Sequence, residues 1–440
     1  MEVSARWNRN LSRRRLLSLV TLMGMLACGS WACGGWALGQ VLDSALPGDI
    51  PGFQVAPGLA RITARRAMAQ PLGFSVQSLE ILPSIDLGAG YDRASGLAAS
   101  GLDGPGSPLV AVTPQLRLID PIIGIAGVVR LNAERYARAP QQDTTNVTAA
   151  LGWRVQIGPD RLDVGVARAA LQEDALGLAA GDGAGSALPF RVQLRAVRAA
   201  WRHQFGVVTL KGGVGATHSQ ISAHGAAPGF RDATSVQGRL QAITTRHAPL
   251  RWVVQLDGRR TNYAGVLVGA PYGTTRALAL QAGVATPRDA IFTLRALVGG
   301  AQVRVVRERG EGVSPTGGVV PVFVLAMGWM PDRLSAVGVS LSRTDTGNPG
   351  LSLPGHPIER AGLAAALGVD RHVVVAARLH GTQAVVPGGV AREWAVRLAV
   401  RWRIGRMVTV APHVSERWRR DVPGLAPREF RAVLALRVAP

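Results

Sequence analysis

WAVRLAVRWR, residues 394–403, alternates apolar and arginine side chains and decides the fold class. In an extended chain, successive side chains point to opposite faces. One face then carries Trp394, Val396, Leu398, Val400 and Trp402, and the other carries Arg397, Arg401 and Arg403. Opposite chemistry at a period of two predicts a strand between an apolar and an aqueous phase. Trp394 and Trp402 are eight positions apart, about 20 Å along a membrane normal for a strand tilted by roughly 40°.

The same alternation recurs along the chain from about residue 78. Trp252, Val254 and Leu256 alternate with Arg251, Gln255, Asp257 and Arg259. Phe323, Leu325, Met327 and Trp329 share one face of a later segment. We count about eighteen such segments, with sixteen as the alternative. No segment has the roughly 20 apolar residues that a membrane helix needs, once the N-terminal region is set aside.

The connections between these segments alternate strictly between short and long. Short ones include residues 158–160, 248–249 and 331–332, where Pro and Asp favour tight reversals. Long ones include residues 92–108, 172–189 and 344–357. A soluble sandwich also alternates, but short turns at one end and long loops at the other are typical of an outer-membrane barrel. The prediction is an all-β, antiparallel, up-and-down transmembrane barrel in a bacterial outer membrane, with both termini in the periplasm.

Residues 1–39 have the pattern of a secretory signal peptide of a Gram-negative bacterium. Five arginines precede the apolar run Leu16–Ala27, and the small-residue site at 37–39 predicts cleavage before Gln40. Both cysteines, Cys28 and Cys33, lie in this segment. We expect residues 40–73 to be a periplasmic segment or a plug, and residues 74–440 to form the barrel. An exported barrel of this kind implies the barrel-assembly machinery as a partner.

Three stretches resemble the β-barrel porin 2 family of outer-membrane proteins. The first is LEILPSIDLGAGYD at Leu79–Asp92, followed by VTPQLRL at 112–118. The others are WMPDRLSAVGVSLSRT at 329–344 and IERAGLAAALGVDRHVVV at 358–375. The resemblance extends over about residues 70–440. It implies an outer-membrane barrel associated with exopolysaccharide secretion. Together with the arginine content described next, the expected partner is an acidic polysaccharide or small anions.

Arginine supplies almost all of the formal net charge of +21, because Lys211 is the only lysine. A charge that faces lipid near mid-membrane costs about 2–4 kcal/mol, which favours the lumen. The residues predicted to line the pore are Arg117, Arg191, Arg195, Arg251, Arg259, Arg397, Arg401, Arg403 and Arg437. Guanidinium groups in a narrow aqueous channel attract anions and repel cations. The alternative is that they only solvate the lumen, paired with carboxylates such as Asp163, Asp257 and Glu393.

The aromatic residues of the apolar faces are predicted to anchor the barrel at the membrane interfaces. They are Trp252, Phe323, Trp329, Trp394 and Trp402. We expect the outer membrane lipid and lipopolysaccharide as partners, the latter through strand-end arginines such as Arg419 and Arg420. A nucleic acid is not expected, since a soluble binder would gather its basic and aromatic residues on one surface.

No sequence signal indicates an enzyme, a cofactor or a metal site. Residues 212–219, GGVGATHS, lack the lysine of a phosphate-binding loop, and no Gly-x-Ser-x-Gly elbow is present. The sequence therefore predicts a passive channel, for export of exopolysaccharide or for passage of anionic solutes. The alternatives are a general diffusion porin and a structural or adhesive surface barrel with a closed lumen.

Overall fold

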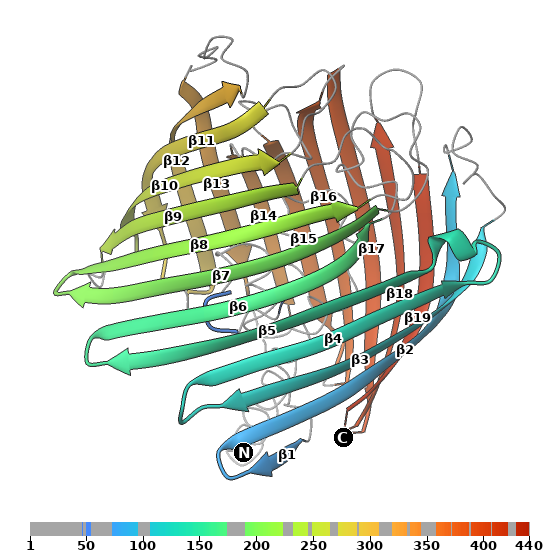
Figure 1. Cartoon of the computed structure of the whole chain (residues 1–440). Coiled ribbons are helices and arrows are strands. Elements are labelled where there is room, and N and C mark those ends of the chain that lie inside the picture. The colour runs from blue at the N-terminus through green and yellow to red at the C-terminus, as the bar shows by residue number, and fades with distance from the viewer. Residues whose placement is uncertain are drawn as a thin grey trace, which may run out of the picture.

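The chain forms a closed antiparallel β-barrel in the computed structural model (Figure 1). The structure describes residues 46, 50–53, 73–95, 106–173, 190–222, 232–244, 249–264, 272–287, 290–307, 319–331, 335–344, 358–370, 372–386, 389–405, 407–420 and 428–439. From β2 to β19 each strand pairs with the next, and β19 pairs with β2 to close the wall. The barrel thus has eighteen strands, as predicted, and a short further strand, β1, pairs with β2 alone.

The barrel strands are ten to seventeen residues long, enough to cross a bilayer when tilted. The strands of the first half are β1 Phe74–Val76, β2 Leu79–Ser95, β3 Ser107–Asp120, β4 Ile125–Tyr136, β5 Thr144–Ile157, β6 Asp160–Glu173, β7 Phe190–Phe205, β8 Val208–Ser222 and β9 Asp232–Thr244. Those of the second half are β10 Arg251–Ala264, β11 Tyr272–Ala285, β12 Phe292–Arg307, β13 Val319–Trp329, β14 Ser335–Thr344, β15 Ile358–Gly368, β16 Val373–Val386, β17 Gly389–Ile404, β18 Val408–Arg420 and β19 Arg428–Val438. A 3-10 turn, Pro140–Gln142, lies between β4 and β5.

Tight turns join the strands at one end of the barrel, and local chemistry explains them. Gly158, Gly206 and Gly405 have φ values of 57°, 50° and 71°, which glycine adopts readily. Between β3 and β4, Asp120 accepts hydrogen bonds from the N–H groups of Ile122 and Ile123, both at 3.0 Å. A side chain that accepts hydrogen bonds from backbone N–H groups stabilises a turn, because those N–H groups have no partner on a neighbouring strand. This end is called the short-turn end below.

Longer connections join most strands at the opposite end, called the loop end. Residues 174–189 connect β6 to β7, and residues 345–357 connect β14 to β15. The expected strict alternation of short and long connections is wrong at one place. Only residues 387–388 connect β16 to β17, because the ladder between these strands continues as far as the Val386–Gly389 pair.

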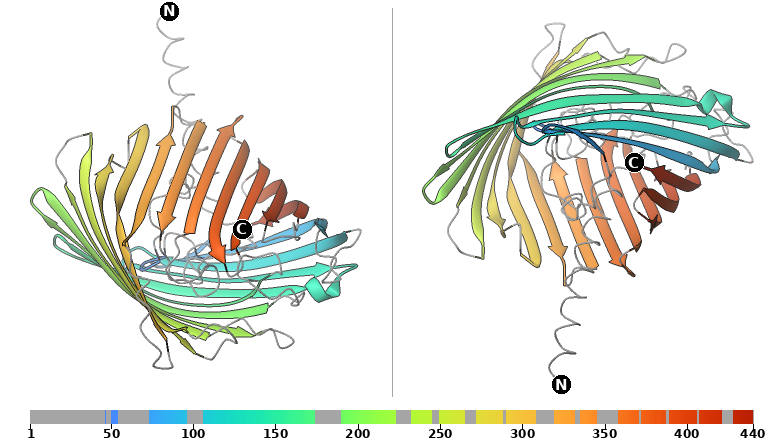
Figure 2. Two further views of the ribbon diagram at one scale, coloured as in Figure 1. Left: turned by 90° about the horizontal axis from the view of Figure 1, so that it is seen from above. Right: turned by 90° about the horizontal axis from the view of Figure 1, so that it is seen from below.

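The outer surface of the barrel is apolar. Val298 of β12 is 68% exposed and Leu280 of β11 is 57% exposed, whereas the adjacent Leu297 is 1% exposed. A soluble protein would bury such side chains, and a barrel in lipid exposes them. Among the described residues, no helix is long and apolar enough to span a membrane. Figure 2 shows the strands tilted around one curved wall.

The largest apolar cluster lies on the inner wall of β4–β7. Leu46, Ile50 and Phe53 of the N-terminal segment pack there against apolar side chains of these strands, and Phe53 is fully buried. The wall residues of the cluster are Ala126, Val128, Ala150, Ala167, Ala169, Val192, Leu194 and Ala196. Most of residues 40–73 and all of the predicted signal segment, residues 1–39, lie outside the described residues.

Candidate functional site

The strand register assigns each barrel residue to the lumen or to the outer surface. On β17, Trp394, Leu398 and Trp402 are 39–54% exposed and face outward. The odd-numbered residues of this strand are on the opposite face, where Glu393 is 3% and Arg401 is 5% exposed. The lumen of this barrel therefore carries buried charge while its exterior carries exposed apolar side chains.

Seven of the nine arginines predicted to line the pore lie on inward faces. Arg251 and Arg259 alternate with outward-facing Trp252 and Leu256 on β10. Arg117 follows outward-facing Leu116 on β3, which is 40% exposed. The remaining inward-facing members are Arg397, Arg401, Arg403 and Arg437.

Arg191 and Arg195 lie on the outer face, so the prediction that they point into the lumen is wrong. Val192 and Leu194 of the same strand, β7, are 1% and 0% exposed and belong to the inner wall. Arg195 shares its exposed face with Val197, which is 55% exposed. At Val192, Leu194 and Ala196 the inner face of β7 is apolar, and the N-terminal segment packs against it.

The five predicted interface aromatics all lie on the outer face. Trp252, Trp329 and Trp402 lie next to the short-turn end of their strands, with 69%, 53% and 51% exposure. Phe323 and Trp394 lie nearer the loop end, with 38% and 39% exposure. Trp394 is the direct cross-strand neighbour of Trp418, also outward-facing. Aromatic side chains therefore occur near both ends of the apolar surface.

Several ion pairs connect inward-facing arginines to carboxylates on other strands, and three of them involve β18 or β19. Arg431 of β19 contacts Glu134 of β4 with a nitrogen–oxygen distance of 2.8 Å. Arg417 of β18 donates from Nε to Glu429 at 2.9 Å. Arg437 pairs with Asp86 of β2, where the Nη2–Oδ2 distance is 2.5 Å. These pairs hold part of the inward-facing arginines against the barrel wall. This agrees with the alternative that such arginines pair with carboxylates and only solvate the lumen.

Positive charge nevertheless exceeds negative charge where the walls of β17–β19 and β2–β4 enclose a hollow. Its charged lining comprises Arg130, Arg397, Arg401, Arg431 and Arg437 against one carboxylate, Asp86. His413, Asn132, Thr113 and Thr409 add polar groups to the same lining. We call this set the arginine hollow.

The arginine hollow brings several guanidinium groups close together. Arg378 is the cross-strand neighbour of Arg397, which adds a further positive charge beside the hollow. Guanidinium groups so placed suit carboxylate or phosphate oxygens, which they bind through paired N–H groups.

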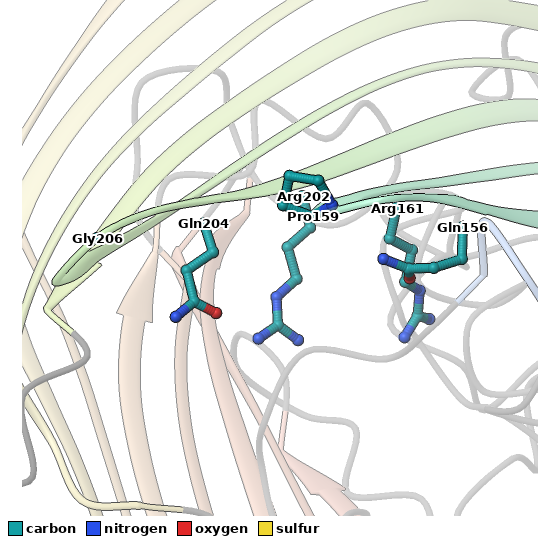
Figure 3. A pocket seen from close by; sticks show the side chains of 6 residues that line it. All are labelled: Gln156, Pro159, Arg161, Arg202, Gln204 and Gly206. Atoms are coloured by element: carbon teal, nitrogen blue, oxygen red, sulfur yellow. The ribbon is translucent and has the colours of Figure 1, made fainter.

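A second basic region lies at the short-turn end of the lumen. Gln156 and Arg161 extend from the β5–β6 hairpin, and Arg202 and Gln204 extend from the β7–β8 hairpin. Figure 3 shows Arg161 and Arg202 pointing to the same side of the wall, into the open space beneath the hairpins. Arg161 contacts Asp163 at 2.9 Å. Two arginines thus lie at this mouth of the barrel.

The described N-terminal residues narrow the lumen from the side of β4–β7. Pro51 and Phe53 contact Gly152 and Gly165, where a Cβ on either glycine would overlap this segment. The ring of Phe53 also lies 5.1 Å from the guanidinium carbon of Arg198, within cation–π range. This wall therefore differs in chemistry from the arginine hollow: it is apolar, and a chain segment covers it.

Sequence reasoning missed several inward-facing arginines, among them Arg130, Arg202 and Arg378. Their strands lack the sustained alternation of WAVRLAVRWR, and β7 carries arginine on both faces. The apolar residues on either side could have identified them, because successive side chains of a strand point to opposite faces. Val129 and Leu131, for example, face outward, so Arg130 between them faces inward. No group of three metal-binding side chains occurs among the described residues.

Comparison with known proteins gives structural similarity at low sequence identity. No family model matches the chain, and no curated protein matches it. The resemblance to the β-barrel porin 2 family therefore stays a prediction. Among solved structures, OccK2 (OpdF) of Pseudomonas aeruginosa in complex with glucuronate matches at 12% identity and a TM-score of 0.42, over 84% of this chain and 100% of that one.

Two further solved structures show similar levels of agreement. OpdK of Pseudomonas aeruginosa with vanillate matches at 10% identity and a TM-score of 0.42, over 82% of this chain and 99% of that one. The FrpB iron transporter of Neisseria meningitidis matches at 9% identity and a TM-score of 0.41, over 76% of this chain and 62% of that one. The fold and the two faces of the wall define the protein as a transmembrane β-barrel.

Proposed function

We propose that the protein is a passive outer-membrane channel for small anionic solutes. The observation that carries the proposal is the arginine hollow, in which five arginines outnumber the two carboxylates that pair with them, Asp86 and Glu134. A lumen lined by one sign of charge raises the local concentration of the opposite ion. A pore lined by arginine selects anions in the same way.

The outer-membrane location rests on the exterior of the barrel. Exposed aliphatic side chains cover the outer face, and aromatic residues occur near both of its ends. Strands that alternate in this way, closed without an edge, cross bacterial outer membranes. We propose that the short-turn end faces the periplasm, and that both termini of the barrel lie there, since an even number of strands brings them to the same end.

The basic short-turn mouth extends the same electrostatic path. Arg161 and Arg202 lie at the periplasmic side in this orientation. An anion that leaves the arginine hollow therefore meets a second positive region rather than a barrier. Export of exopolysaccharide remains a prediction from the sequence resemblance, whereas the described lumen argues for an anionic solute of small size, since a chain segment covers part of the wall.

A closed structural barrel is the second candidate, because Leu46, Ile50 and Phe53 pack inside the wall. In this case residues 40–73 would act as a plug, and the arginines would only solvate the interior. The two candidates differ in one measurable property, ionic current.

The test is single-channel conductance of the purified protein in a planar bilayer under a salt gradient. The channel proposal expects open current with a reversal potential that indicates anion preference. The double variant Arg397→Ala/Arg401→Ala should lose most of this preference, and the matched variant Arg168→Ala, on the exposed outer face of β6, should retain it. A cation-selective current would contradict the role of the arginine hollow. Absence of current in folded protein would favour the closed barrel.

A further inference from the structure

Three arginines form a continuous row on the outer face of the barrel near the loop end. Arg260 of β10 is the direct cross-strand neighbour of Arg276 of β11, which in turn neighbours Arg304 of β12. All three side chains are exposed. They share their faces with outward-pointing Leu256, Leu278 and Val298, so they project away from the lumen. We call this set the outer arginine row.

The row lies at the boundary between the apolar surface and the loops. Arg260 is eight positions along β10 from Trp252, the same separation as that between Trp402 and Trp394 on β17. It therefore lies at the level of the aromatic residues of the loop end, about 20 Å from those of the short-turn end. Toward the short-turn end the surface turns apolar, with Leu278 and Leu280 exposed by 54% and 57%.

The outer arginine row has an unbalanced charge. Like charges directly opposite each other on adjacent strands destabilise the pair. Two other outward-facing arginines have acidic neighbours: Arg343 contacts Glu359 at 3.6 Å, and Arg428 contacts Glu416. Among the described residues, no carboxylate forms an ion pair with a member of the row. Arg260 donates a hydrogen bond from Nε to the side-chain oxygen of Asn262 at 3.2 Å.

We propose that the outer arginine row binds the phosphate groups of a phosphorylated glycolipid of the outer leaflet, of the lipid A type. Guanidinium groups bind phosphate oxygens bidentately and remain charged at every physiological pH. Adjacent strands are about 4.8 Å apart, so the two ends of the row are separated by about 10 Å. This width suits a headgroup that carries more than one phosphate on linked sugars.

The apolar surface beside the row identifies the source of the phosphate as a lipid. The acyl chains of a lipid whose headgroup contacts Arg276 lie along Leu278 and Leu280 of the same strand and face. A free phosphate ion would gain nothing from these side chains. The proposal rests on the outer-membrane location given above, but it does not depend on whether the lumen conducts.

The test is binding of purified bisphosphorylated lipid A to the detergent-solubilised protein, followed by native mass spectrometry. We expect the variant Arg260→Gln/Arg276→Gln/Arg304→Gln to bind at least about tenfold more weakly, since three charge-assisted contacts are lost. The matched control Arg343→Gln removes an outward-facing arginine that already has an acidic partner, and should bind as the parent does. Retention of heat-modifiable migration in gel electrophoresis shows that each variant is folded.

The remaining outcomes decide between sources of the phosphate. Lipid A without its phosphates should bind as weakly to the parent as bisphosphorylated lipid A binds to the triple variant. Equal binding of bisphosphorylated lipid A to parent and triple variant would overturn the proposal. Displacement by inorganic pyrophosphate at equal concentration would also overturn it, because the site would then select phosphate without the lipid. Conductance of the triple variant should be unchanged, so failure here and failure of the channel proposal are distinguishable.

Discussion

Arg431 of β19 and Glu134 of β4 form an ion pair across two intervening strands, β2 and β3, with a nitrogen–oxygen distance of 2.8 Å. The two side chains are 12% and 8% exposed. The hydroxyl of Tyr136 lies 3.3 Å from the same carboxylate, as a donor. This pair connects the last strand of the barrel to a strand near its beginning through the lumen.

Removal of this carboxylate should destabilise the barrel strongly. The variant Glu134→Gln leaves Arg431 buried without its charged partner, and loss of one member of a buried pair costs about 3–5 kcal/mol. Urea unfolding in detergent micelles measures the change. The control is Glu359→Gln, since the Arg343–Glu359 pair is 33% and 45% exposed and should contribute less than about 1 kcal/mol. Equal effects of the two substitutions would contradict this difference.

Gly165→Ala should displace the N-terminal segment from the inner wall. A Cβ at this position would lie 2.7 Å from the ring of Phe53, whereas one at Gly213 would lie 3.7 Å from its nearest neighbour. We therefore expect Gly165→Ala, but not Gly213→Ala, to increase the unit conductance of the channel. A closed parent that becomes conductive would favour the plug. Unchanged conductance in both variants would show that this segment does not restrict the pore.

The outer face of β12 offers a test of the membrane position. Val298 is 68% exposed near the middle of the strand, and Gln302 lies on the same face next to the outer arginine row. Val298→Arg should lower the free energy of unfolding in lipid bilayers by about 2–4 kcal/mol, and Gln302→Arg by no more than about 1 kcal/mol. An equal decrease in the free energy of unfolding for both variants would show that the lipid-facing surface is not centred near Val298.

Arg202 at the short-turn mouth should contribute to ion selectivity. The variant Arg202→Glu reverses one charge in the lumen and should shift the reversal potential toward cations under a salt gradient. Arg195→Glu makes the same change on the outer face of the same strand and should leave the reversal potential unaltered. A shift of similar size in both variants would mean that the effect is not exerted in the lumen.

The fold could be predicted because lipid and water face opposite sides of each strand. In β10 and β17 this produces strict alternation, and the orientations of Arg251, Arg259, Arg397 and Arg401 follow from it. The same rule explains why Trp252 and Trp402 lie on the exterior. The number of strands follows from the number of alternating segments, since each crosses the membrane once.

The orientation of β7 could not be predicted in the same way. This strand carries arginine on both faces, with Arg195 outward and Arg198 inward beside Phe53. Part of its inner face is apolar, at Val192, Leu194 and Ala196, and residues far away in the chain pack on this part. Periodicity contains no information about that contact. The outer arginine row could not be predicted for a related reason. Its three members are neighbours because of the register between β10, β11 and β12, which the spacing of residues within one strand does not determine.

Closure of the barrel by β2 and β19 sets the order in which it can assemble. Asp86 and Arg437, 351 positions apart in the chain, are cross-strand neighbours at this seam. Until they meet, both strands present unpaired backbone groups, which favour aggregation. Contacts between residues so distant form slowly, because a long stretch of chain must lose its freedom first. The yield of assembly should therefore depend on how long the unpaired edges of β2 and β19 are kept from pairing with other chains. The pairing of β2 with β19 should be the last step, after all the other strands are in place.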